Sequence, residues 1–289
     1  MSRVAETTKT RRPFSWRKAR VGSRVLAVVF CIVWIFPVYW MVNTAFKPAS
    51  EVMTPTPHFI PQHPTLENFT LAITQSTFFR SLLNSAIVVG CAIVFALVLA
   101  LFAAAALSRF RFRGRRLIMI IILAVQMLPA TALLIPQFLI FNDLNLLNTY
   151  WGLILAYVAT VLPFSIWMLR GFFVTIPNEL EEAAWVDGAS TWRTLRSILF
   201  PLVLPGVIST SIFAFMTAWN EYILAYTFMK DQTMYTLPIW LVSFSTPTQG
   251  INYAGQMAAS VLFSLPGVVF FMIIQRNLVA SMSAGAVKG

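Results

Sequence analysis

Six long apolar stretches restrict what this chain can fold into. Each stretch holds about 18 residues or more, and a helix of that length crosses roughly 30 Å of hydrocarbon. Lipid offers no partner to exposed backbone groups, so each stretch must be helical. The sequence therefore predicts an all-α integral membrane protein with six transmembrane helices. The predicted spans are Val25–Asn43, Leu82–Leu107, Leu117–Phe141, Tyr150–Leu169, Leu204–Phe228 and Ala258–Gln275.

Prolines inside the predicted spans indicate bends. Pro129 and Pro136 fall in the third span and Pro163 in the fourth. Because proline removes one helical hydrogen bond and its ring crowds the preceding turn, we expect kinks in both helices.

The composition agrees with a lipid environment. Apolar residues make up 58% of the chain and charged residues 11%, against roughly a quarter charged in soluble domains. Too few polar groups remain to cover a water-facing surface. The net charge of +11 would by itself be compatible with nucleic acid. We expect no nucleic-acid partner, because the basic residues cluster where spans end, at the level of lipid headgroups.

The distribution of Lys and Arg predicts the orientation. Eighteen of the 21 basic residues fall before the first span, in the second and fourth connections, or in the tail; only Lys47, Arg80 and Lys230 fall on the other side. By the positive-inside rule, both termini are expected in the cytoplasm. A cleaved signal peptide is a less favoured alternative, since the first apolar run is long and no small-x-small site follows it.

These boundaries divide the chain into three parts. We expect a basic cytoplasmic N-terminus over residues 1–24, a six-helix domain over 25–276 and a cytoplasmic tail over 277–289.

The fourth connection, about residues 177–201, has an unusual pattern. Pro177 and three glutamates form a good helix start, because acidic groups meet the positive end of the helix dipole. Asp187-Gly188 is a turn signal, and Ser190 or Thr191 can cap a second helix that ends at Pro201. This predicts a helix–turn–helix at the cytoplasmic face. From the residues alone, an amphipathic surface connection without further function remains open.

The same connection resembles a known motif. Glu182-Ala183-Ala184, then three residues, Gly188, nine residues, Ile198 and Pro201 match the EAA loop of membrane subunits of binding-protein-dependent ABC importers. Phe200 stands where leucine is usual, which keeps an apolar residue. The resemblance implies the type I ABC importer permease fold and a location in a bacterial cytoplasmic (plasma) membrane. It also implies that an ATPase is contacted by Glu181, Glu182, Ala183, Ala184, Asp187, Gly188 and Ala189.

Other segments resemble maltose-type carbohydrate permeases, in particular the second permease subunit. These are Asp187-Gly188-Ala189, Trp219-Asn220-Glu221 and the last six residues. The resemblance implies import of a sugar or oligosaccharide with a second permease, an ABC ATPase dimer and an extracytoplasmic sugar-binding protein. In such systems the tail also reaches the ATPase, which implies contacts from Gly285, Ala286, Val287, Lys288 and Gly289.

The chain itself carries no recognisable nucleotide site. No glycine is directly followed by lysine, so the phosphate-binding pattern G-x-x-x-x-G-K-[ST] is absent. We therefore expect a non-catalytic subunit without a cofactor, with ATP and Mg²⁺ bound on the partner ATPase. We expect no metal either, because His58 and His63 have no cysteine or clustered carboxylates beside them.

Polar residues within the spans are candidates for the substrate path, since sugar hydroxyls need hydrogen-bond partners. They are Asn84, Gln126, Asn220 and Glu221. Glu221 is the only acidic residue in a predicted span, and an ionisable group in lipid suggests function. Interhelical bonding or a solvated helix end are the alternatives for it.

Two other classes of protein are alternatives. An ion-coupled secondary transporter needs ionisable groups near the bilayer midplane, where only Glu221 is arguable. A membrane-embedded enzyme would need a motif such as H-E-x-x-H or an intramembrane lysine, and the predicted spans hold neither.

Overall fold

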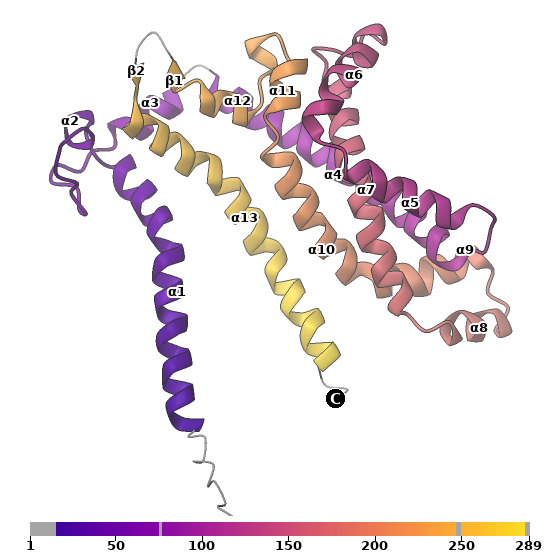
Figure 1. Ribbon diagram of the computed structural model, residues 1–289. Coiled ribbons are helices and arrows are strands. Elements are labelled where there is room, and N and C mark those ends of the chain that lie inside the picture. Colours follow the sequence, from indigo (N-terminus) through magenta and orange to yellow (C-terminus); the bar gives the residue numbers. More distant parts are fainter. Residues whose placement is uncertain (1–15, 75–76, 247–249, 287–289) are drawn as a thin grey trace, which may run out of the picture.

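The structure is a computed structural model that describes residues 16–74, 77–246 and 250–286. Its long helices are joined by shorter ones (Figure 1). The α-helices are α1 Trp16–Ala45, α2 Ala49–Val52, α3 Glu67–Thr74, α4 Phe78–Arg109, α5 Arg115–Gln126, α6 Ala130–Asp143, α7 Tyr150–Thr175, α8 Glu179–Val186, α9 Thr191–Thr194, α10 Phe200–Trp219, α11 Ile223–Phe228, α12 Leu237–Val242 and α13 Tyr253–Ala286. A π-helical turn, Leu195–Leu199, joins α9 to α10, and a 3-10 turn, Gln232–Met234, precedes α12.

One short hairpin accompanies the helices. Strands β1 (Ser245–Thr246) and β2 (Gly250–Ile251) pair antiparallel, with Ser245 opposite Ile251 and Thr246 opposite Gly250.

The apolar helices confirm the predicted fold class. In the described residues, five helices are long and apolar enough to cross a bilayer, and the pair α5 and α6 supplies a sixth span if counted together. The predicted third span was wrong in one respect. It is not one kinked helix but two helices bent by 102°. Pro129 is the last residue of the break and precedes α6 in an extended conformation, which a continuous helix cannot accommodate.

The boundaries of the last two spans also differ from the prediction. The fifth span starts within the connection, at Thr191, and ends at Trp219 instead of Phe228. Residues 220–222 interrupt it, and the separate helix α11 follows. The last helix runs from Tyr253 to Ala286, well beyond the predicted Ala258–Gln275.

The centre of the bundle is the packing of α4 along α7. Ala92, Ala96, Ala100 and Ala104 recur at every fourth position of α4, and each is 0% exposed. Such a stripe of small residues lets two helix backbones approach closely, which is how helices associate where water supplies no driving force. The interhelical contact thus follows from the spacing of these alanines.

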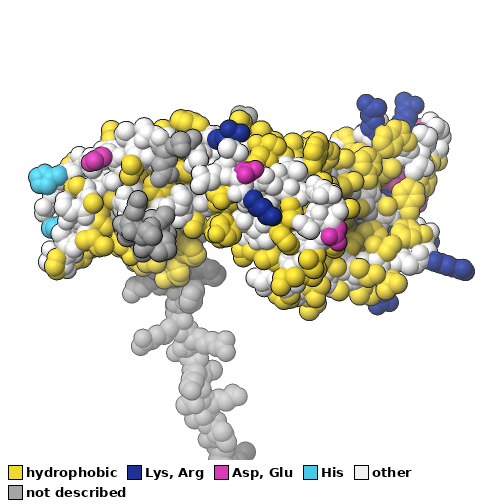
Figure 2. Space-filling model, turned by 90° about the horizontal axis from the view of Figure 1, so that it is seen from above, with side chains coloured by type: hydrophobic (Ala, Val, Ile, Leu, Met, Phe, Trp, Pro, Cys, Tyr) yellow, Lys and Arg dark blue, Asp and Glu magenta, His cyan; other side chains and the backbone are white. Residues whose placement is uncertain are grey.

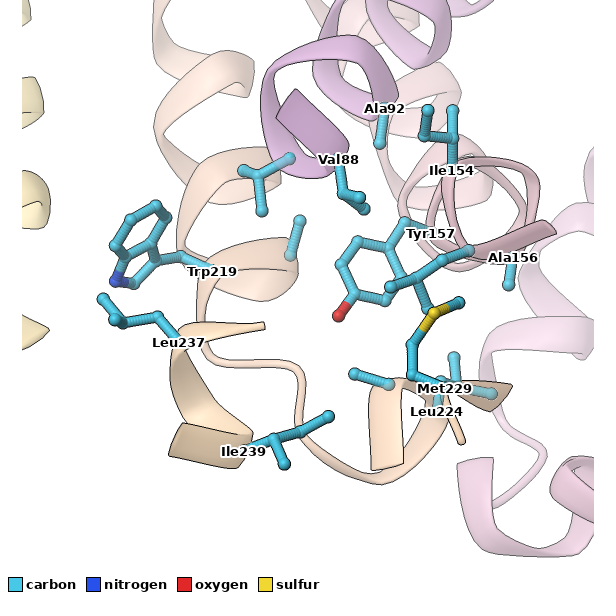
Figure 3. Packing of buried hydrophobic residues seen from close by; sticks show 14 of the residues in the cluster. Val88, Ala92, Ile154, Ala156, Tyr157, Trp219, Leu224, Met229, Leu237 and Ile239 are labelled. Atoms are coloured by element: carbon cyan, nitrogen blue, oxygen red, sulfur yellow. The ribbon is translucent and has the colours of Figure 1, made fainter. Parts of the chain in front are cut away.

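Tyr157, in the first half of α7, fills the core beside α11. Figure 3 shows Tyr157 between Val88 of α4 and Leu224 and Met229 of the α11 region. Its hydroxyl donates to the backbone carbonyl of Glu221 at 3.2 Å. The core therefore joins α7 to the interruption between α10 and α11.

Helix α1 lies apart from the bundle and packs mainly against α13 (Figure 1). None of its most apolar stretch is buried; Trp34, for example, is 76% exposed. Figure 2, seen from above Figure 1, shows hydrophobic side chains interspersed with uncharged ones and only scattered charged groups. An exposed apolar surface such as that of α1 needs lipid or another chain to cover it.

The loop between α2 and α3 is fastened by a buried carboxylate. Glu51 accepts from the backbone N–H of Gln62 at 2.9 Å and of His63 at 3.4 Å. The hydrogen bond from Gln62 is the main cause that lowers the pKa of Glu51. A lowered pKa favours the folded loop above the carboxylate's ordinary range, and this contribution is lost as the pH falls through the lowered value.

The start of α7 depends on a glycine, which gives a testable prediction. A Cβ on Gly152 would lie 2.0 Å from the backbone oxygen of Leu146. We expect Gly152→Ala to destabilise the fold by about 1–3 kcal/mol or more, because backbone must shift. Gly171 has nothing within 4 Å of its Cβ position, so Gly171→Ala is the matched control. Thermal unfolding of the two purified variants checks this, and equal melting temperatures would contradict it.

Candidate functional site

The site begins with α8, the first helix of the 177–201 connection. Glu179, Glu181 and Glu182 all fall in its first turn, where the helix dipole favours negative charge. The helix starts at Glu179, with Asn178 before it. The predicted helix start is therefore confirmed to within two residues.

The end of α8 is a Schellman motif. The N–H of Ala189 donates to Ala184 O at 2.9 Å, and the N–H of Gly188 donates to Trp185 O at 3.0 Å. Gly188 has φ +79°, the left-handed conformation that glycine adopts without steric cost. The turn predicted from Asp187-Gly188 is confirmed.

The second helix of the connection does not end where it was predicted to. Ser190 caps α9 by accepting from the N–H of Arg193 at 3.3 Å, as predicted. The chain then continues through the π-helical turn and Pro201 into α10. In that turn the N–H of Phe200 donates five residues back, to Leu195 O. This wider turn precedes Pro201, which has no N–H to donate. The connection therefore joins the fifth span without a break.

The two faces of α8 have different environments. Glu181 and Ala184 face inward and are 7% and 6% exposed. Glu182, Ala183, Asp187 and Gly188 are exposed, and Ala189 is half-buried. Three large apolar side chains also face outward: Leu180, Trp185 and Val186 are 43%, 51% and 88% exposed.

An arginine at the end of α4 holds α8 in place. Arg109 Nε lies 2.9 Å from Glu181 Oε1. The same guanidinium donates to Asn178 Oδ1 at 2.6 Å and to Ile176 O at 2.9 Å. The pair with Glu181 is a contact between charges rather than an aligned hydrogen bond, since neither atom has a hydrogen-bond partner with good geometry among the described residues. Arg109 thus attaches the start of α8 to α4.

Burial raises the pKa of the Glu181 carboxyl, and the charge of Arg109 offsets part of that increase. Because the folded state then binds a proton more readily than the unfolded chain, this group stabilises the fold least at high pH. Its contribution falls as the pH rises from the ordinary carboxyl range through the raised value. The pair is the only ion pair in the part of the chain that the structure describes.

The predicted substrate-path residues do not share one environment. Asn84 is 1% exposed. Its Nδ2 donates to Thr233 O and Tyr235 O at 3.0 and 2.8 Å, and its Oδ1 accepts from Tyr150 at 2.7 Å. Both donors of the amide and one acceptor position of its oxygen hold the segment before α12 against α4 and α7, which gives Asn84 a structural role.

The other three path residues lie at interruptions of spans. Gln126 is the last residue of α5, before the 102° bend, and Asn220 follows α10; both are exposed. Glu221 accepts from the N–H groups of Leu224 and Ala225 at 2.9 and 3.1 Å. Its carboxylate therefore caps α11, which gives this acidic residue a structural role.

The last five residues, expected to contact the ATPase, lie partly beyond the described residues. Val287, Lys288 and Gly289 are outside them, and Gly285 and Ala286 belong to the last turn of α13. Their expected contacts with the ATPase stay a prediction.

Sequence reasoning missed Arg109 as part of this site. The sequence counts Arg109 only among the basic residues of the second connection, between the second and third spans. Its partners lie about 70 positions away, so no local pattern connects them. The one available signal was an unpaired acidic residue on the inward face of a short helix.

The apolar spans and the helix–turn–helix of the 177–201 connection define a multi-pass membrane permease subunit. Residues 92–284 match the model of the family described as "Binding-protein-dependent transport system inner membrane component", and the chain belongs to this family. It is 43% identical to the diacetylchitobiose uptake system permease protein DasC of Streptomyces coelicolor, over 93% of this chain and 98% of that protein.

Two further similarities extend over most of the chain. The trehalose/maltose transport system permease protein MalG of Thermococcus litoralis is 34% identical over 91% of this chain and 95% of its own length. A subunit in the crystal structure of a bacterial ABC transporter that imports alginate has a TM-score of 0.77 at 23% identity, over 92% of this chain and 99% of that one; this shows the fold. The ion-coupled and enzymatic alternatives gain no support.

Proposed function

We propose that this chain forms half of the translocation pathway of an ATP-driven importer for a sugar or oligosaccharide. The named relatives take up diacetylchitobiose and trehalose or maltose. A second, different permease subunit would supply the other half, and an extracytoplasmic binding protein would deliver the cargo. The uncovered surface of α1 supports a partner permease beside it.

The observation that carries the proposal is the two-faced environment of α8. Its inward face is attached to α4 through Arg109 and Glu181. Its outward face exposes Leu180, Trp185 and Val186, an unusual apolar surface for a short connection in water. A groove on an ABC ATPase, which binds ATP and Mg²⁺, would cover these side chains. Movement of the ATPase would then reach α4 through Arg109 and α10 through the continuous helix from α9.

The charge distribution supports a cytoplasmic location for α8 and both termini. The first helix begins, and the last helix ends, on the same side of the molecule as α8 (Figure 1). Arg109, Arg111 and Arg115 lie beside α8 on that side, as the positive-inside rule requires. The tail contacts from Gly285 to Gly289 remain part of the proposal.

The interruptions at residues 127–129 and 220–222 are proposed to line the pathway. Irregular backbone at membrane depth is tolerated where it is buried in protein or lines a water-filled cavity. Gln126, Asn220 and Glu221 would offer hydrogen-bond partners to sugar hydroxyls there.

Cysteine crosslinking tests the proposal with a built-in control. Ala183 faces outward and Ala184 inward, so only the first thiol can reach a docked neighbour. We expect Ala183→Cys to crosslink a P-loop ATPase in intact cells, with at least about tenfold lower yield from Ala184→Cys. Mass spectrometry of the adduct identifies the partner. If Ala183→Cys never captures a nucleotide-hydrolysing chain, the coupling role is lost, whereas the membrane architecture stands.

A further inference from the structure

A cavity of about 520 Å³ lies between α5 and α7. Its polar end is lined by Arg115, Arg116 and Arg170, and its apolar wall by Met119, Leu123 and Trp167. This cavity shares Arg115 with the cavity beside α8, but none of its lining residues belongs to α8 or has a part in the proposed coupling.

The charged residues that line the cavity are all positive. No Asp or Glu lines it. Arg115 also lines the neighbouring cavity with Glu181 and Glu182, whereas Arg116 and Arg170 do not. None of the three arginines forms an ion pair within the described residues. Arg115 and Arg170 make only long bonds, both of 3.4 Å, to backbone carbonyls. Most of their guanidinium donors remain available to an anion.

The arrangement of the lining has a polar end and an apolar stem. Arg115, Met119 and Leu123 follow one another at every fourth position of α5, so they share one helix face. They extend over roughly 12 Å along the axis. On α7, Trp167 lies one turn from Arg170. Leu123 and Trp167 are 41% and 47% exposed.

We infer that this cavity binds an anionic phospholipid, with its phosphate on the arginines and an acyl chain along Met119, Leu123 and Trp167. The planar fork of arginine matches phosphate oxygens, and basic pockets between spans suit anionic headgroups. Tryptophan is favoured at the membrane interface. A soluble anion would leave the apolar stem exposed, which favours a lipid. Assignment to the cytoplasmic leaflet rests on the proposed topology.

Lipid retention tests this inference. The transporter, in the assembly with which it purifies, is placed in nanodiscs of equal phosphatidylglycerol and phosphatidylcholine and released for native mass spectrometry. We expect phosphatidylglycerol to be retained preferentially. Because each substitution removes specific charge-assisted hydrogen bonds to the phosphate, retention should fall roughly tenfold in Arg116→Gln and roughly 100-fold in Arg116→Gln/Arg170→Gln. Both faces are exposed in nanodiscs, so the result does not depend on orientation or on ATPase coupling.

The control is Arg113→Gln, which removes one charge from the same segment without touching the cavity lining. Retention in this variant should match the unmodified chain. An equal loss in Arg113→Gln would mean diffuse surface attraction and would overturn the site. Equal retention of both lipids, displacement by millimolar inorganic phosphate, or complete crosslinking of Leu123→Cys to another polypeptide would overturn it as well. Since Arg116 makes no hydrogen bond within the described residues, its variant should remain folded.

Discussion

Replacing Gly188 with tryptophan is expected to abolish uptake while the chain remains in the membrane. Gly188 has φ +79°, and nothing lies within 4 Å of its Cβ position. A large side chain therefore finds open space in this chain and meets obstruction only from a partner. The left-handed conformation adds a penalty of about 1–2 kcal/mol for any L-residue. Uptake of labelled sugar and the amount of chain in the membrane fraction are the two measurements.

Gly188→Ala separates backbone strain from bulk. It carries the same conformational penalty but projects only a methyl group, so we expect it to keep most of its uptake. Gly188→Asn tolerates the left-handed region better but projects a larger side chain, so its uptake should lie between those of the alanine and tryptophan variants. Equal loss in the alanine and tryptophan variants would assign the effect to strain in the Schellman turn. Normal uptake in Gly188→Trp would remove the coupling role from this connection.

Removal of Arg109 is expected to have the second largest effect. Arg109→Ala eliminates the contacts with Glu181, Asn178 and Ile176 together. It leaves the Glu181 carboxylate buried without a counter-charge, which costs about 3 kcal/mol for a buried pair. We expect α8 to detach from α4, amide hydrogen exchange over residues 176–188 to accelerate at least tenfold, and uptake to fall accordingly.

A double variant tests whether the unpaired charge is the cause. In Arg109→Met/Glu181→Leu no buried charge remains, and such replacements are close to neutral for stability. Amide hydrogen exchange over residues 176–188 should be slow again in this double variant if the unpaired Glu181 carboxylate causes the detachment. Arg113→Ala serves as the matched control, because it removes a nearby arginine that makes no described contact with α8. Unchanged exchange in Arg109→Ala would contradict the attachment.

Much of the fold could be predicted from the sequence because a bilayer restricts which segments can cross it. A span must be apolar over its whole length and helical throughout, so six stretches, their order and the intervening connections could be predicted without any contact. Local rules also found the caps of the 177–201 connection. The acidic first turn, Gly188 and Ser190 act through neighbours within five residues, and the structure confirmed each of them.

The same local rules failed where more than one conformation satisfied them. Pro129 predicted a bend but not its size, and α5 and α6 are bent by 102° in the structure. Pro201 predicted a helix end, yet a π-helical turn carried the helix onward. Asn84 and Glu221 were polar residues in apolar stretches, and the sequence left open what they bind. In the structure Asn84 binds Tyr235, and Glu221 binds the start of α11.

The sequence by itself determined that this chain spans a membrane with helices and presents a short helix between the fourth and fifth spans, because hydrophobicity, helix capping and turn formation depend on adjacent residues. Only the tertiary structure decided which face of that helix is held by Arg109, which polar side chains are used internally, and where three arginines meet an apolar wall. Those features join residues far apart in the chain, and their energies arise only once α4, α5, α7 and α8 have packed together.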